Sequence, residues 1–137
     1  MKVFLDTNVL VSAVATRGLC ADLVQVVLAD HQLVVGETVL TELRRILRRK
    51  LRVPDSTIQE LDAFLRRHAD VVSDAPPVHL RLRDPSDLPV IAEALAGTSD
   101  VLVTGDADLL AVATKSPVPI VAPRAFWELL RRGQSSE

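Results

Sequence analysis

The segment Phe4-Leu5-Asp6-Thr7-Asn8 decides the fold, because an apolar strand that begins at Lys2 ends directly in a carboxylate and two small polar residues. In an open parallel sheet, ligands bind outside the carboxyl ends of the strands. The segment Val101-Leu102-Val103-Thr104-Gly105-Asp106 repeats the pattern, with a second apolar strand that ends in a polar turn and an aspartate. The sequence therefore predicts two strand ends that each bring an aspartate to the edge where chemistry usually takes place.

Strand-like and helical patterns alternate along the rest of the chain, which is typical of an α/β fold. The expected strands cover residues 2–5, 32–35, 70–73, 101–104 and 117–121, and prolines in the last one indicate a sheet edge. The expected helices cover residues 9–15, 21–29, 38–50, 58–68, 88–96, 108–113 and 123–131, and Gly97 suits the position after the fifth of them. We therefore expect a three-layer sandwich in which helices flank a mainly parallel central sheet.

The length of 137 residues predicts one domain that can bury a core of its own. We place this domain at residues 1–132 and a polar C-terminal tail at residues 133–137. A single cysteine, Cys20, excludes an internal disulfide and a cysteine-rich zinc site. The sequence shows no signal-peptide pattern and no apolar run near the roughly 18 residues of a membrane helix. We therefore expect a cytoplasmic protein without a membrane segment.

The formal net charge of −2 argues only weakly against a nucleic-acid partner, because bound cations would offset a cluster of acids. The chain has three phenylalanines, one tryptophan and no tyrosine. Stacking of bases on an aromatic platform is therefore unexpected. A nucleic acid would be held mainly through its backbone.

Four acids at the starts of elements are candidates for a site, and each also has a purely structural explanation. Asp6 and Asp106 can cap the helices that follow their strands. Glu42 lies in the first half of a helix, where the helix dipole favours an acid. Asp87, or its neighbour Ser86, can cap the helix that follows. Four carboxylates in one place, however, repel one another strongly, and only protonation or a cation makes such a cluster tolerable.

The expected cation is Mg²⁺ or Mn²⁺, because hard oxygen ligands without nearby histidine or cysteine suit these ions. The three histidines, His31, His68 and His79, show no metal-ligand spacing. If the acids converge, the sequence therefore predicts a divalent-metal site made of carboxylates.

The ordered set of motifs resembles that of the PIN-domain family. The first strand ends in Asp6-Thr7-Asn8, and a middle helix carries Thr41-Glu42-Leu43. A later helix opens with an acid in the segment Asp84-Pro85-Ser86-Asp87, and the signature closes with Thr104-Gly105-Asp106-Ala107-Asp108 after a strand. The last two segments resemble the subgroup of toxins from toxin–antitoxin pairs, although that subgroup is richer in acids after the Asp-Pro pair. The identity of the third acid therefore stays open between Asp84 and Asp87.

The resemblance implies a Mg²⁺- or Mn²⁺-dependent endoribonuclease with a cognate antitoxin, and we also expect a homodimer. The acidic site that it implies consists of Asp6, Glu42, Asp87 and Asp106, with Asn8, Thr104 and Asp108 beside it. Asp87 is favoured over Asp84, because a carboxylate at the start of a packed helix is held more accurately than one in the loop before Pro85.

Two further interpretations remain open. Arg45 and Arg49 lie on the Glu42 side of their helix and are candidates for RNA phosphate contacts, although most charge runs are solvated faces. A non-catalytic PIN-like module that binds RNA or a protein is the alternative to a nuclease. A phosphatase with an Asp-x-Asp nucleophile motif is disfavoured, because position 8 is an asparagine.

Overall fold

The computed structural model describes residues 1–135, and its centre is a parallel sheet of five strands in the order β3-β2-β1-β4-β5. The strands are β1 (Lys2–Leu5), β2 (Gln32–Gly36), β3 (Ala69–Val72), β4 (Val101–Val103) and β5 (Ile120–Val121). The helices are α1 (Thr7–Ala15), α2 (Leu19–Asp30), α3 (Glu37–Arg49), α4 (Asp55–His68), η1 (Pro85–Asp87), α5 (Leu88–Ala96), α6 (Ala107–Leu110) and α7 (Pro123–Ser135). The predicted α/β sandwich is confirmed, and all strand pairs are parallel.

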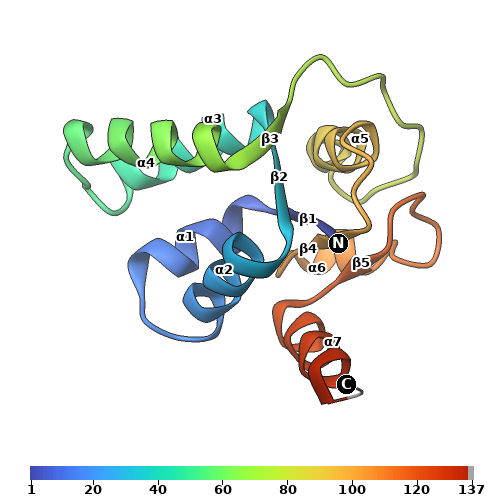
Figure 1. Ribbon diagram of the computed structural model, residues 1–137. Coiled ribbons are helices and arrows are strands. Elements are labelled where there is room, and N and C mark those ends of the chain that lie inside the picture. Colours follow the sequence, from blue (N-terminus) through green and yellow to red (C-terminus); the bar gives the residue numbers. More distant parts are fainter. Residues whose placement is uncertain (136–137) are drawn as a thin grey trace.

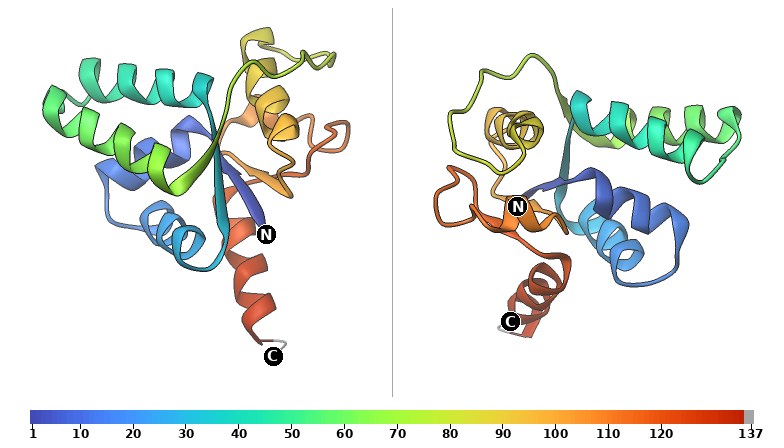
Figure 2. Two further views of the ribbon diagram at one scale, coloured as in Figure 1. Left: turned by 45° about the horizontal axis from the view of Figure 1, so that its top comes forward. Right: turned by 180° about the vertical axis from the view of Figure 1, so that it is seen from behind.

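Helices cover both faces of the sheet. Helices α1 to α4 lie on one side of the strands and α5 lies on the other, which is clearest in the left view of Figure 2. The segment between β3 and η1 runs around the outside of α5 (Figure 1), and α7 packs against α2. Because both faces are covered, strand β1 reads as a continuous apolar run, and Val3, Phe4 and Leu5 are fully buried.

The chain changes direction across the sheet at strand β1. It first adds β2 and β3 on one side of β1, then crosses through α5 to add β4 and β5 on the other side. A crevice outside the carboxyl ends of the strands is expected at this reversal. The residues after β1 and β4 flank it, and the two strand ends are joined where the Asp6 amide donates a hydrogen bond to the Val103 carbonyl (3.0 Å).

Helices α3 and α4 form a hairpin (residues 37–68) that extends away from the sheet (Figure 1). Arginine–carboxylate pairs join the two helices. Arg44 binds Asp62 (2.7 Å), Arg66 binds Glu37 (2.6 Å), and Arg48 binds Asp55 (2.9 Å). These pairs explain much of the arginine run as a structural feature of the hairpin.

The end of helix α5 differs from the prediction. Gly97 follows the helix but has φ −77°, and the left-handed conformation is taken by Thr98 (φ 51°). Gly97 is needed for another reason, because a Cβ there would lie 2.7 Å from Val34 Cγ1 and 2.9 Å from Val72 Cγ2. The glycine lets the end of the helix approach the sheet closely.

The C-terminal part also differs from the prediction. The edge strand is only Ile120–Val121, since the prolines before it leave few amides for a ladder. Helix α7 continues to Ser135, past its predicted end near residue 131, so most of the expected polar tail is helical. Residues 136–137 of that tail lie outside the described residues. Among the described helices none is long and apolar enough to cross a membrane alone, and α1 and α2 reach that length only as a pair bent by 108°.

Candidate active site

Asp6 occupies the position directly after β1 and caps helix α1. Its Oδ1 accepts a hydrogen bond from the Thr7 amide (2.8 Å), and its Oδ2 accepts from the Thr104 hydroxyl (2.6 Å) and the Asn8 side-chain amide (3.1 Å). Burial raises the pKa of Asp6, and repulsion from Asp106 adds to this, although these hydrogen bonds oppose the rise. Asp6 is therefore a carboxylate held in one orientation by its neighbours, and only 5% of it is exposed.

Asn8 and Thr104 link the ends of strands β1 and β4. The Asn8 Oδ1 accepts from the Gly105 amide (2.8 Å), while the Thr104 hydroxyl oxygen accepts from the Asp106 amide (3.0 Å). Thr104 is fully buried, so its hydroxyl is shielded from water. The two predicted supporting residues thus fix the turn that presents Asp106.

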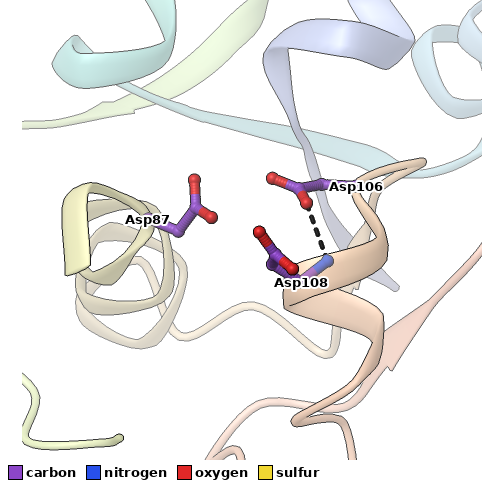
Figure 3. A group of neighbouring side chains, drawn as sticks. All are labelled: Asp87, Asp106 and Asp108. Atoms are coloured by element: carbon purple, nitrogen blue, oxygen red, sulfur yellow. Dashed lines mark hydrogen bonds between the residues drawn. The ribbon is translucent and has the colours of Figure 1, made fainter. Parts of the chain in front are cut away.

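Asp106 and Asp108 lie together at the start of α6. Asp106 caps this short helix, and its Oδ1 accepts from the Asp108 amide (2.8 Å). The cap uses one carboxylate oxygen and places the two acids side by side. Figure 3 shows both carboxylates on the side of the helix that faces Asp87.

Asp84 and Asp87 have different environments at the start of α5. Asp84 is exposed and caps η1, because its Oδ1 accepts from the Ser86 amide (3.0 Å) and the Ser86 hydroxyl (2.7 Å). These bonds lower the pKa of Asp84. Asp87 stands at the cap position of α5, yet its side chain makes no capping bond. Helix capping therefore explains Asp84 and leaves Asp87 unexplained.

Carboxylate oxygens of Asp87, Asp106 and Asp108 lie within 4.8 Å of one another (Figure 3). Partial burial, followed by repulsion from Asp106 and Asp84, raises the pKa of Asp87 to about 6. Mutual repulsion of this kind is relieved by a cation. Three carboxylates at this spacing, without a sulfur or imidazole ligand, fit a hard divalent ion such as Mg²⁺ or Mn²⁺.

A cavity of about 690 Å³ opens beside Asp87 and Asp106, and we call it the acidic cleft. Asp6 and Asp106 line it from the strand ends, while Asp84, Asp87 and Val90 line it from η1 and α5. The opposite wall is one face of α3, where Thr38, Glu42, Ile46 and Lys50 follow at four-residue intervals. All four predicted acids therefore border one cavity.

Sequence and structure comparisons identify the family and the fold of this chain. The model of the PIN domain matches residues 2–108, which is most of the chain. This chain belongs to the PIN-domain family. A comparison with curated proteins finds no match.

The PIN fold is also seen in solved structures of low sequence identity. A chain of VapBC2 from Rickettsia felis, bound to a DNA fragment from its promoter, is 16% identical with a TM-score of 0.61, over 89% of this chain and 98% of that one. A chain of VapBC-1 from nontypeable Haemophilus influenzae is 18% identical with a TM-score of 0.65, over 90% of this chain and 99% of that one. At this identity the likeness establishes the fold.

The four predicted acids differ in whether the protein already engages their carboxylate oxygens. Both oxygens of Asp6 accept hydrogen bonds from the protein, and Glu42 pairs with Arg45, whose Nε lies 3.2 Å from Glu42 Oε2. Neither belongs to the group of three within residues 1–135 that could hold one ion. Asp108, expected only as a supporting residue, takes a place in that group instead, because the Asp106 cap turns its backbone toward Asp87.

Two features of the structure were not predicted from the sequence, one in the cleft and one outside it. Lys50 lines the cleft, whereas the predicted phosphate contacts Arg45 and Arg49 do not, although the i, i+4, i+8 spacing from Glu42 was a usable signal for Lys50. Glu93 is a buried acid on α5 with 5% exposure. Its sequence context, Ile91-Ala92-Glu93-Ala94, contains no motif that distinguishes it from an ordinary helical glutamate.

Proposed function

We propose that this PIN domain is a metal-dependent endoribonuclease that hydrolyses RNA phosphodiester bonds. The observation that carries the proposal is the convergence of Asp87, Asp106 and Asp108 within 4.8 Å, where Asp87 and Asp106 line an open cleft of about 690 Å³. An acidic cluster alone is common on protein surfaces. Its position at the reversal of the sheet, together with the PIN family membership, supports a catalytic role.

In this proposal Asp87, Asp106 and Asp108 hold Mg²⁺ or Mn²⁺, with Asp6 and Glu42 at the border of the site. Such an ion, when bound, lowers the pKa of a water and stabilises charge on phosphate oxygens. Repulsion of Asp87 from Asp106 and Asp84 in its absence is a physical reason that the site would bind it.

The remaining residues orient the acids and bind the substrate. Thr104 and Asn8 hold the Asp6 carboxylate through hydrogen bonds, so that it keeps one orientation beside Asp106. Glu42 borders the site from the α3 wall, where it is paired with Arg45. Lys50 lies on the same wall and is placed to contact a phosphate of a strand that lies in the cleft.

We further propose that the chain acts in the cytoplasm as the toxin of a toxin–antitoxin pair. The support is the fold of the VapBC chains, which belong to two-component complexes. A cognate antitoxin protein and a homodimer are the expected partners. Co-expression with a small gene adjacent to its own would test the antitoxin, by recovery of a stable complex and loss of growth inhibition.

The decisive experiment is cleavage of single-stranded RNA by the purified protein with Mg²⁺, with Mn²⁺ and with excess chelator. We expect cleavage with metal only, and strongly reduced cleavage from the Asp87→Asn and Asp106→Asn variants. Binding of RNA without cleavage in either metal would contradict the nuclease proposal. That result would favour a non-catalytic module that uses the same cleft for binding.

A further inference from the structure

Glu93 is a buried carboxylate outside the acidic cleft, and its surroundings are specific. It lies on α5 and faces the start of α3, and only 5% of it is exposed. Burial raises its pKa, while hydrogen bonds from Thr38 and from the Glu37 amide oppose that rise. An acid is costly to bury in this way, so its retention calls for a physical reason.

The contact of Glu93 with α3 is a helix cap supplied by another helix. The Thr38 amide donates to Glu93 Oε2 (3.1 Å). Gly36 stands at the cap position of α3 and has no side chain that could accept from the free amides of the first turn. The Glu93 carboxylate takes over that role and also places negative charge at the positive end of the helix dipole.

The absence of a side chain at Gly36 makes room for the Glu93 carboxylate. A Cβ at Gly36 would lie 2.2 Å from Glu93 Oε1 and 2.4 Å from Glu93 Cδ. Its φ of −104° is open to any residue, so the glycine serves the close approach of the carboxylate and not a special backbone conformation. Glu93 Oε1 is buried against it without a hydrogen-bond partner among the described residues. The two residues therefore fix α5 against the start of α3.

The contact of Glu93 with Gly36 and Thr38, which we call the joint, connects the two walls of the acidic cleft. Thr38, whose amide is bonded to Glu93, lines the cleft and begins the α3 stripe that continues with Glu42. On α5, Asp87 and Val90 line the cleft, and Glu93 follows Val90 after three residues, on the same side of the helix.

We propose that Glu93 is a positioning residue, which ties the start of α3 to α5 and so sets the spacing between the wall that carries Glu42 and the wall that carries Asp87. The structural part of this inference is independent of activity. Its consequence for catalysis rests on the proposed ribonuclease function. A displacement of about 1 Å at a catalytic group can cost about 100-fold in rate, so a less rigid contact between α3 and α5 would lower the rate of cleavage.

The test compares Glu93→Ala, Glu93→Gln and the control Glu60→Ala, which removes an exposed glutamate from α4. The spacing is measured between spin labels at Arg49→Cys on α3 and Leu95→Cys on α5, in a Cys20→Ser background. We expect Glu93→Ala to broaden the distance distribution in the folded protein. Glu93→Gln, which keeps an acceptor for the Thr38 amide, and Glu60→Ala should retain the parent distribution.

In the variants without labels, RNA cleavage gives the second measurement, at saturating metal and at a temperature where each protein is folded. We expect Glu93→Ala to lower kcat about 10-fold or more with little change in KM, and Glu93→Gln to restore most of it. A residue with only a structural role would lower the melting temperature and leave kcat of the folded protein unchanged, which would overturn the proposal.

The label distances separate this proposal from the proposed function. If the parent protein cuts no RNA, the ribonuclease proposal fails, and a distribution that broadens in Glu93→Ala still supports the joint. A distance distribution in Glu93→Ala like that of the parent would overturn the proposal for Glu93, whatever the cleavage result. If Glu93→Ala fails to fold, Gly36→Ala gives the same test, because its methyl group would displace the Glu93 carboxylate. A distance distribution like that of the parent in Gly36→Ala would also overturn the proposal.

Discussion

The carboxylates of the α3–α4 hairpin and those of the acidic cleft differ in what lies opposite them. In the hairpin, Glu37 and Asp62 face arginines, and hydrogen bonds from Arg66 lower the pKa of Glu37. Burial would raise the pKa of Asp62, but hydrogen bonds from Arg66 and Arg44 outweigh it and lower that pKa. In the cleft, Asp87 lies beside Asp106 and Asp108, and partial burial followed by repulsion from Asp106 and Asp84 raises its pKa to about 6.

This difference separates acids that stabilise the fold from acids that are candidates for a functional site. A paired acid at the surface contributes little or modestly to stability, and its replacement is felt in the hairpin alone. Acids that repel one another lower the stability of the metal-free protein, so the fold gives no reason to keep them together. Perturbed carboxylates in a cleft are for this reason candidates for function.

The largest expected effect separates the two groups by activity. Asp87→Asn should lower RNA cleavage about 10³-fold, because several kcal/mol of transition-state charge stabilisation would be lost with the cation. The matched change in the hairpin, Asp62→Asn, should leave the rate of the folded protein within about twofold and lower its stability. Rates are compared at saturating metal on one RNA. Equal rates for the parent and Asp87→Asn would remove Asp87 from the site.

The neighbouring Asp84 gives a finer control for the same prediction. Asp84→Asn removes a cap of η1 and should reduce the rate only partially, because it loosens the turn before Asp87. A dead Asp84→Asn variant beside an active Asp87→Asn variant would reverse the assignment of the third acid.

The second effect is on stability with metal. Mn²⁺ should raise the melting temperature of the parent, since an ion that binds only the folded state at 100 times its Kd adds about 2.7 kcal/mol. Asp106→Asn should lose this response, whereas Asp62→Asn should melt at a lower temperature and keep it. Thermal denaturation with and without chelator measures both. A response that survives Asp106→Asn would place the ion elsewhere.

The fold was largely predictable from the sequence, because apolar strands that are buried on both faces leave a clear signal. The alternation of strand and helix predicted the sandwich, and the motifs from Asp6 to Asp106 indicated the PIN resemblance, which the family match confirms. The boundaries were less accurate where tertiary contacts decide them. Gly97 was expected to end α5 through its own conformation, but its role is to clear the side chains of Val34 and Val72.

The four predicted acids border one cleft, but the sequence does not indicate which of their carboxylate oxygens the fold already uses. Capping explains Asp84 and part of Asp6, and this depends on hydrogen bonds that a sequence pattern does not specify. Glu93 could not be found at all, because its partner is the start of a helix more than fifty residues earlier in the chain. The catalytic roles of the four acids stay predictions until cleavage is measured.

The third effect is a pH dependence of opposite sign in the two regions. In the metal-free protein the pKa of Asp87 is about 6, against 3.8 for an ordinary aspartate, so the folded state keeps a proton that the unfolded state releases. Stability from this group is therefore present at low pH and is lost as pH rises from about 4 to 6. The pKa of Asp62 is lowered, so its contribution is present at neutral pH and is lost as pH falls below about 4.

Denaturant unfolding in chelator from about pH 2 to 7 measures both signs, because the two groups titrate on opposite sides of the ordinary pKa of an aspartate. Relative to the parent, Asp87→Asn should become more stable as pH rises, by about 1 kcal/mol at pH 7 after allowance for solvent screening. Asp62→Asn should be less stable than the parent at pH 7 and approach it only as pH falls below about 4. If Asp87→Asn follows the parent at a constant difference, the pKa of Asp87 is not raised by burial and by its acidic neighbours.

The smallest effect concerns the arginines where the two regions meet on α3. Arg45 pairs with Glu42 at the cleft, and Arg49 is exposed on the same side, whereas Arg48 pairs with Asp55 in the hairpin. The double change Arg45→Gln and Arg49→Gln should weaken RNA binding several-fold and reduce the salt slope by about 0.7 for each phosphate that is no longer neutralised.

Titrations in an Asp87→Asn background prevent cleavage during the measurement. Arg48→Gln is the matched control and should change neither quantity, because its guanidinium serves the hairpin. Equal affinities and slopes for all three proteins would show that the arginines on the cleft side are a solvated face and that Lys50 alone is left to contact phosphate from this helix.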